Sequence, residues 1–196
     1  MSVMPTVGRF RAKDLLLAPN LLSLARLPLA ATFPLTTSVR PLALAVLALA
    51  GVSDVVDGWL ARRLGQATPT GAVVDPITDK LFVLSVVVTL VTAGELSLMG
   101  VLLMSVREIG ELPLVFWFIA SRRVRGARAT KAAANVPGKA VTLLQFVSIT
   151  AALLRSPAQA ALLYATAGAG LVAALTYWMR EVGAFRVHAK EEREAG

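Results

Sequence analysis

The chain has no cysteine and a single histidine, and it carries few charged residues. Without cysteine there is no disulfide framework, no thiol nucleophile and no cysteine-ligated metal site. The one histidine, His188, lies in a charged segment, which argues against histidine-dependent catalysis. Charged residues make up 16% of the 196 residues, whereas a soluble globular domain usually carries about 25%. This composition argues against a disordered chain, a disulfide scaffold and a soluble nucleic-acid-binding domain.

Hydrophobic residues make up 56% of the chain, and they gather in six continuous runs separated by short breaks rich in proline, glycine, serine and threonine. The runs are Leu21–Leu35, Pro41–Leu60, Val73–Ala93, Leu96–Ala120, Val136–Leu154 and Ala158–Trp178. A transmembrane helix needs about 20 mostly apolar residues, and barrel strands would instead alternate apolar and polar residues. The sequence therefore predicts an all-α, polytopic membrane protein with six transmembrane helices.

The formal net charge of +8 is distributed unevenly along the chain. Most lysines and arginines lie before the first run, after the second, between the fourth and fifth, and after the sixth. Because an excess of basic residues marks cytoplasmic segments, we expect both termini and segments 62–71 and 121–135 in the cytoplasm. The charge is then explained by orientation in the cell inner (plasma) membrane, and no nucleic-acid partner is needed.

Three segments follow from this pattern. Residues 1–18 mix basic and apolar side chains and lack the cleavage site of a signal peptide, so we expect an amphipathic helix on the cytoplasmic surface. Residues 19–182 form the six-helix transmembrane domain, and residues 183–196 form a charged cytoplasmic tail.

Four aspartates interrupt the second and third runs: Asp54, Asp57, Asp75 and Asp79. A carboxylate at the centre of a membrane span costs roughly 2.5 to 3.5 kcal/mol, so such residues usually have a function. Each pair shares a helix face, at i,i+3 and i,i+4. Asp54 and Asp79 lie at matching depths of about 12 to 14 Å from the cytoplasmic end of the two spans. An antiparallel hairpin would therefore gather all four carboxylates.

Four negative charges at one place repel one another unless cations neutralise them. Mg²⁺ and Mn²⁺ accept all-oxygen ligands and bridge phosphate oxygens, which predicts a two-metal site. The absence of histidine and cysteine from these spans argues against zinc. Two alternatives stay open: the aspartates pair with Arg62, Arg63 and Lys80, or they form a proton or cation pathway. Small residues between the acids allow close approach of either a helix or a ligand.

The four aspartates and the residues between them follow a recognisable sequence motif. Asp54-Val-Val-Asp57-Gly58-Trp-Leu-Ala61-Arg62 is followed after eight residues by Gly71-Ala-Val-Val-Asp75-Pro-Ile-Thr-Asp79. This string matches D-x2-D-G-x2-A-R-x8-G-x3-D-x3-D at every fixed position and resembles the signature of the CDP-alcohol phosphatidyltransferase family. The resemblance implies that an alcohol hydroxyl attacks the lipid-side phosphorus of a CDP-linked lipid and releases CMP.

The resemblance also implies roles for individual residues. All four aspartates would hold the metals, and Asp79 would also act as the general base toward the acceptor hydroxyl. The remaining motif residues would bind the CDP group, with contacts from Gly58, Ala61 and Arg62 and with Gly71 allowing its close approach. Family likeness also suggests a homodimer.

Further short matches concern the branch of the family. The opening Pro19-Asn20-Leu-Leu-Ser23-Leu-Ala-Arg26 resembles that of phosphatidylglycerophosphate and cardiolipin synthases and adds Asn20 and Ser23 to the CDP-binding residues. Arg107-Glu108 and Gly138-Lys139 resemble the first of these two branches. The resemblance thus implies CDP-diacylglycerol as the donor and glycerol 3-phosphate as the acceptor. Phosphatidylglycerol, an inositol phosphate or another alcohol are alternative acceptors, and a cation or proton transporter is the alternative from another class.

A phosphorylated acceptor needs cations beyond those that balance the aspartates. Arg107 and Lys139, near the cytoplasmic ends of their spans, are candidates to bind its phosphate, with help from Arg122 or Arg123. Each has a structural alternative: Arg107 as a counter-ion of Glu108 or Glu111, Lys139 as an interfacial lysine, and the loop arginines as determinants of topology and of contact with anionic lipids.

Overall fold

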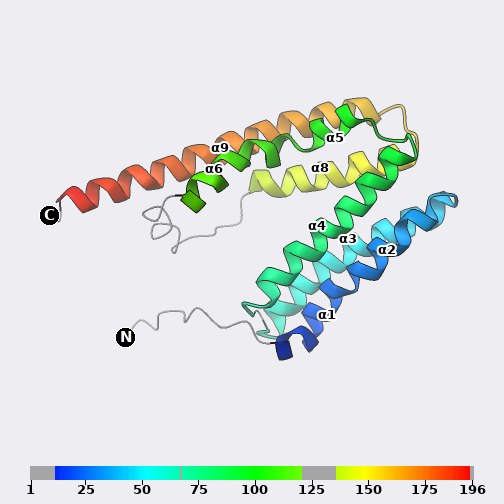
Figure 1. Ribbon diagram of the computed structural model, residues 1–196, viewed down its shortest axis with the longest axis horizontal. Helices are drawn as coiled ribbons and strands as arrows, with labels where there is room; N and C mark the ends of the chain where they lie inside the picture. The colour runs from blue at the N-terminus through cyan, green and yellow to red at the C-terminus, as the bar shows by residue number, and fades with distance from the viewer. Residues whose placement is uncertain (1–11, 67, 121–135, 195–196) are drawn as a thin grey trace. The chain divides into compact units, whose positions relative to one another are not determined.

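The computed structural model describes residues 12–66, 68–120 and 136–194, and within these ranges every regular element is a helix, as predicted (Figure 1). Arg122 and Arg123 lie outside the described residues, and so do residues 1–11 of the expected surface helix. The helices form two compact units, Met1–Glu95 and Leu96–Gly196, which are described separately. The segment boundaries at residues 18 and 182 remain predictions.

The first unit contains the short 3₁₀ helix η1 (Ala12–Leu16) and the helices α1 (Ala18–Leu24), α2 (Arg26–Thr36), α3 (Arg40–Arg63) and α4 (Gly71–Thr92). The first apolar run is thus divided at Ala25, close to Pro28, which has no N–H to donate to the carbonyl of Leu24. Both α1 and α2 pack against α3 and against α4 (Figure 1). The two aspartate-bearing helices, α3 and α4, are therefore joined by α1 and α2, which contact both of them, as well as by the loop between them.

The core of this unit lies between α2, α3 and α4. Phe33 and Phe82 are buried and meet edge to face, with ring centroids 6.3 Å apart and an interplanar angle of 73°. Pro34, inside α2, cannot donate to the carbonyl of Ala30, and Ser85 Oγ of α4 donates to that carbonyl instead over 2.6 Å. This bond fixes α2 against α4 where the proline leaves an acceptor unsatisfied.

The second unit contains α5 (Leu98–Met104), α6 (Val106–Ala120), α8 (Val136–Leu153) and α9 (Gln159–Glu194), and α9 packs against the other three. A Cβ atom on Gly110 would lie 2.9 Å from the Cβ of Ala174, so glycine lets α6 approach α9 closely. Trp178 Nε1 donates to the Gly110 carbonyl over 2.8 Å. The helix α9 continues without a break from the sixth apolar run through the charged tail to Glu194.

Two of the described helices are long and apolar enough to cross a membrane, Arg40–Arg63 and Gln159–Arg180. The first and fourth runs are divided at Ala25 and Ser105, and α4 has 22 residues but carries Asp75, Asp79 and Lys80. The apolar helix of the fifth run, Gly138–Leu153, is shorter than a membrane span. The number of six spans therefore remains a prediction.

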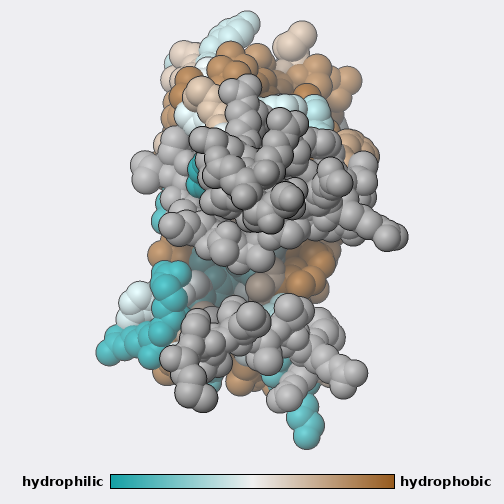
Figure 2. All heavy atoms as spheres, turned by 90° about the vertical axis from the view of Figure 1, so that its left-hand side faces the viewer, coloured by the Kyte–Doolittle hydropathy of each residue, from teal (hydrophilic) through white to brown (hydrophobic). Residues whose placement is uncertain are grey.

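Many large apolar side chains of these helices are exposed. They include Leu49 and Val52 on α3, Leu84 and Val88 on α4, and Leu171 and Leu175 on α9. On the face that Figure 2 draws, hydrophobic side chains (brown) lie at the surface together with hydrophilic ones (teal). Exposed apolar surface on this scale is expected of helices that contact lipid.

Candidate functional site

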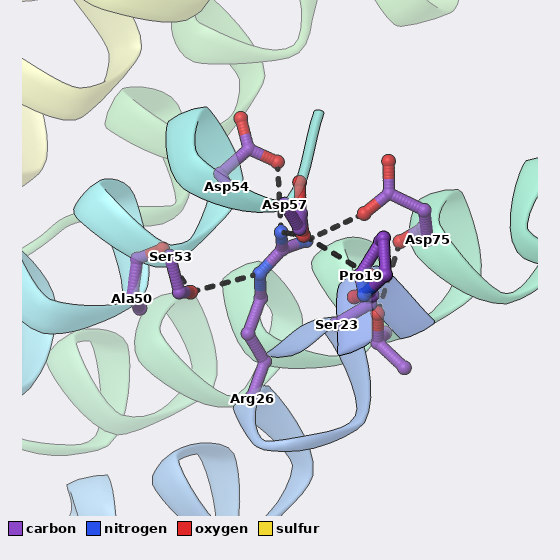
Figure 3. A network of polar contacts seen from close by, with 9 residues as sticks. Pro19, Ser23, Arg26, Ala50, Ser53, Asp54, Asp57 and Asp75 are labelled. Carbon is purple, nitrogen blue, oxygen red and sulfur yellow. Dashed lines mark hydrogen bonds and ion pairs between the residues drawn. The ribbon is translucent and has the colours of Figure 1, made fainter. Parts of the chain in front are cut away.

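Three of the four aspartates converge in the first unit. Carboxylate oxygens of Asp54, Asp57 and Asp75 all lie within 4.8 Å of one another. The first two come from successive turns of α3, and the third comes from the second turn of α4 (Figure 3). The predicted meeting of acids from two consecutive helices is thus present, with three members instead of four.

Arg26, the first residue of α2, lies at the centre of this group (Figure 3). Its Nη2 lies 3.1 Å from Asp54 Oδ1 and donates to Asp57 Oδ2, and its Nη1 lies 3.1 Å from Asp75 Oδ1. The side chain is 1% exposed. One buried guanidinium therefore bridges both aspartate-bearing helices, using its planar fork of donors.

Ser53 holds the third side of this guanidinium. Arg26 Nε donates to Ser53 Oγ over 3.2 Å, and the serine hydroxyl donates in turn to the Ala50 carbonyl over 2.7 Å (Figure 3). Because Ser53 already donates one turn back along α3, its oxygen is oriented as an acceptor. The position of Arg26 is therefore set by the hydroxyl of Ser53 as well as by the three carboxylates.

The aspartates differ in their surroundings. Asp57 is buried and accepts a hydrogen bond from Ser23 Oγ over 3.0 Å. The side chains of Asp54 and Asp75 are 51% and 45% exposed, so the cluster is open on one side. Asp79 lies one helical turn after Asp75, is half-buried, and makes none of the ion pairs with Arg26.

A cavity of about 190 Å³ opens beside Asp57 and Asp75. Five residues that the family resemblance implies as CDP contacts line it: Asn20, Ser23, Gly58, Ala61 and Gly71. A Cβ on Gly58 would meet only the end of the Arg62 side chain, at 3.5 Å, so this glycine leaves space and is not needed for helix packing. The structure thus brings together residues from α1, α3 and α4 that are far apart in the sequence.

Gly71 has a different role in the same cavity, because it lets α1 approach the first turn of α4. A Cβ at this position would lie 2.5 Å from Asn20 Oδ1, a separation that real atoms do not tolerate. Asn20 is buried, and its Nδ2 donates to the Asp14 carbonyl over 2.6 Å. Asp14 Oδ2 also accepts from Thr70 Oγ1 over 3.1 Å. The 3₁₀ helix η1 is thereby attached to the start of α4.

Two residues of the site were not predicted as functional. Arg26 appeared only within the opening motif, although an arginine inside an apolar run is itself a signal for a buried ion pair. Gln66 lies in the α3–α4 connection and lines the cavity, and its Oε1 is buried without a hydrogen-bond partner in the described part of the chain. Gln66 Oε1 is therefore placed to accept a hydrogen bond from a group bound in the cavity.

The second unit contains the residues predicted to bind the acceptor phosphate. Arg107 of α6 donates from Nη1 to the Gly138 carbonyl of α8 over 3.0 Å, and Lys139 follows as an exposed residue. Arg107 also pairs with Glu108 at 3.4 Å and has Nε 3.7 Å from Glu111 Oε1, too far for a hydrogen bond. Arg107 is therefore bound to the start of α8, at the residue before Lys139, and is partly neutralised by Glu108 and Glu111.

The donor set of the acidic cluster fits a hard divalent cation. Three carboxylates within 4.8 Å supply only oxygen ligands, which suit Mg²⁺ or Mn²⁺ better than zinc. The guanidinium of Arg26 contacts the same three carboxylates, so a cation bound there would lie close to a positive charge.

Comparison with known proteins agrees with this site. The family model of the CDP-alcohol phosphatidyltransferases matches residues 16–178. A probable phosphatidylglycerophosphate synthase of Mycobacterium tuberculosis is 34% identical over 159 residues, which is 76% of this chain and 72% of that protein. A CMP-forming cardiolipin synthase of Streptomyces coelicolor is 40% identical over 116 residues, 55% of this chain and 54% of that protein.

The match to the Streptomyces protein thus spans about half of its length. A shorter match, 54% identical over 46 residues, joins 24% of this chain to 24% of a CDP-diacylglycerol–glycerol-3-phosphate 3-phosphatidyltransferase of Pseudomonas fluorescens. These relatives are named as synthases or transferases, which confirms the predicted class of enzyme at the level of the family. Together with the matched residues 16–178, they establish that the chain belongs to the CDP-alcohol phosphatidyltransferase family.

Proposed function

We propose that this chain transfers the phosphatidyl group from CDP-diacylglycerol to glycerol 3-phosphate and releases CMP. The observation that carries the proposal is the convergence of Asp54, Asp57 and Asp75 at the wall of a cavity lined by the other motif residues. An acidic cluster beside a cavity suits a substrate whose pyrophosphate is bound through divalent cations.

Asp54, Asp57, Asp75 and Asp79 would hold Mg²⁺ or Mn²⁺ in a two-metal site. Bound there, the ions would supply positive charge to the pyrophosphate and to the departing CMP. Support for this part comes from the all-oxygen donor set and from the open side of the cluster, where Asp54 and Asp75 are about half exposed.

The cavity would receive the CDP group. Asn20, Ser23, Gly58, Ala61 and Gly71 line it, and Arg62 lies against Gly58 at its edge. The side-chain amide of Gln66 has a buried oxygen without a partner, which suits hydrogen bonding to a nucleotide base. Small side chains at positions 58 and 61 leave room for the flat base and the ribose, and Gly71 lets α1 and α4 close one wall of the cavity.

Asp79 would act as the general base. It would accept the proton of the acceptor hydroxyl while that oxygen bonds to the lipid-side phosphorus and the bond from phosphorus to the CMP oxygen breaks. Its position one turn from Asp75, outside the Arg26 ion pairs, leaves its carboxylate available for this task.

The acceptor phosphate would bind to Arg107 and Lys139, with Arg122 and Arg123 contributing from the adjoining loop. Arg107 is 23% exposed, and its buried Nε has no hydrogen-bond partner among the described residues. A donor of this kind can still form a charge-assisted bond to phosphate. Phosphatidylglycerol is the second acceptor to consider, because one relative is named as a cardiolipin synthase.

The enzyme would work as a homodimer in the cell inner (plasma) membrane, with six spans and with the mouth of its site facing the cytoplasm. The apolar helices α3 and α9 and the exposed leucines and valines of α3, α4 and α9 support the membrane location. The basic segments that flank the spans support the orientation.

The proposal is tested by supplying purified protein with CDP-diacylglycerol and Mg²⁺ or Mn²⁺ and offering one acceptor at a time. We expect CMP release with glycerol 3-phosphate. Release with phosphatidylglycerol or an inositol phosphate but not with glycerol 3-phosphate would show that the acceptor is wrong and the class of reaction right. Ion flux into liposomes without nucleotide, together with no CMP release for any acceptor, would favour the transporter alternative.

A further inference from the structure

Arg26 contacts the same three carboxylates that are suited to hold a metal. Its two Nη atoms reach Asp54 Oδ1, Asp57 Oδ2 and Asp75 Oδ1, and no other cation of the described residues forms an ion pair with these aspartates (Figure 3). Its Nε is fixed on the opposite side by Ser53. The guanidinium is therefore held between the acids by four contacts.

A divalent cation would compete with this guanidinium for the same carboxylate oxygens. Mg²⁺ binds carboxylate oxygens at about 2.0 to 2.1 Å, and the Arg26 nitrogens lie 3.1 Å from the oxygens of Asp54 and Asp75. An ion on these oxygens would lie next to a positive charge whose side chain is 1% exposed, where solvent screens repulsion poorly. The two cations therefore oppose one another for this set of ligands.

We propose that Arg26 is an internal counter-ion of the acidic cluster, which keeps the three aspartates together in the metal-free protein and lowers their affinity for divalent cations. The inference rests on the proposed function, because it concerns the metal of that reaction. Asp54, Asp57 and Asp75 would hold a metal through carboxylate oxygens that Arg26 contacts. Arg26 stabilises the folded protein when no metal is bound, because it neutralises the three aspartates. It weakens metal binding for the same reason, since the metal must compete with it for these carboxylates.

The test compares the parent with Arg26→Gln and Arg26→Lys without any lipid substrate. Free Mn²⁺ is followed by electron paramagnetic resonance during a titration, and thermal unfolding is measured with and without Mn²⁺. Removal of the charge should lower the dissociation constant for Mn²⁺ roughly tenfold, as expected for the loss of a close like charge. It should also lower the melting temperature of the metal-free protein and increase the stabilisation by Mn²⁺.

Arg26→Lys keeps the charge as a single ammonium that cannot bridge three carboxylates with a planar fork. We expect a smaller fall in the dissociation constant, and this variant decides the question if Arg26→Gln does not fold. Arg63→Gln is the matched control, because it removes one positive charge from the exposed end of α3, where Arg63 stacks on Trp59. Its Mn²⁺ affinity should stay close to that of the parent.

Unchanged or weaker Mn²⁺ binding in the Arg26 variants would overturn the inference and would make Arg26 a support of the metal ligands. Weaker binding of CMP with unchanged Mn²⁺ affinity would overturn it as well, since Arg26 would then serve the nucleotide. A parent protein that binds no Mn²⁺ would instead overturn the metal site of the proposed function.

Discussion

Asn20 and Gly71 are in such close contact that a single added carbon would separate them, because a Cβ on Gly71 would lie 2.5 Å from Asn20 Oδ1. Asn20 belongs to α1 and is buried, and Gly71 is the first residue of α4. This contact closes one wall of the cavity beside Asp57 and Asp75. It assigns to Gly71 the role of allowing two helices to meet, which the sequence motif left open between packing and ligand binding.

Gly71→Ala should therefore damage both the fold and the cavity. The added methyl group must displace Asn20, whose amide also holds the Asp14 carbonyl, and we expect a loss of about 1 to 3 kcal/mol in the free energy of unfolding. Binding of CMP should fall as well. Gly168→Ala is the control, because a Cβ there meets nothing within 4 Å. Equal melting temperatures and CMP affinities of the Gly71→Ala variant and the parent would contradict the prediction.

Gly58→Ala should lower the affinity for CMP without lowering the stability of the fold. A Cβ at Gly58 meets only the end of the Arg62 side chain, at 3.5 Å, and alanine in a helix interior is more stable than glycine by about 0.5 to 1 kcal/mol. The melting temperature should therefore stay or rise while CMP affinity falls, because the methyl group enters the cavity. A calorimetric CMP titration beside a thermal melt measures both. An unchanged CMP affinity would place the nucleotide outside this cavity.

The sequence predicted the helical class and the convergence of acids from two consecutive helices, because spacing within a helix and the cost of burying charge are local properties. The cavity residues came from the family resemblance, and the structure brings five of them together while their contact with CDP stays a prediction. The sequence did not predict that Arg26 lies among the acids, since that depends on how α1 and α2 pack against both α3 and α4. The separation of Asp79 from the other three also depends on packing, because i,i+4 spacing fixes a helix face but not which neighbour meets each turn.

Asp79→Asn should abolish turnover while leaving the folded site in place. Asp79 makes no ion pair with Arg26, so its substitution should leave thermal stability and CDP-diacylglycerol binding measurable. CMP release should fall at least about a hundredfold, the usual contribution of a general base. Asp57→Asn is the contrasting variant, because it weakens a buried contact of Arg26 and should reduce both stability and metal-dependent binding. Turnover equal to the parent would remove Asp79 from the role of base.

Arg107→Ala tests the acceptor site, and the result depends on which of two roles this residue has. If it binds the acceptor phosphate, the KM for glycerol 3-phosphate should rise about 10- to 100-fold, the loss expected for a charge-assisted hydrogen bond, with the KM for CDP-diacylglycerol little changed. If it serves only to join α6 to α8 through the Gly138 carbonyl and to balance Glu108, the melting temperature should fall and both KM values should stay the same.

Thr142→Val is the control for Arg107→Ala, because it removes one contact of Arg107, 3.4 Å long, and keeps the charge. Steady-state kinetics with each substrate varied in turn, beside thermal melts of the two variants, distinguishes the roles, since only a phosphate-binding arginine acts on one substrate alone.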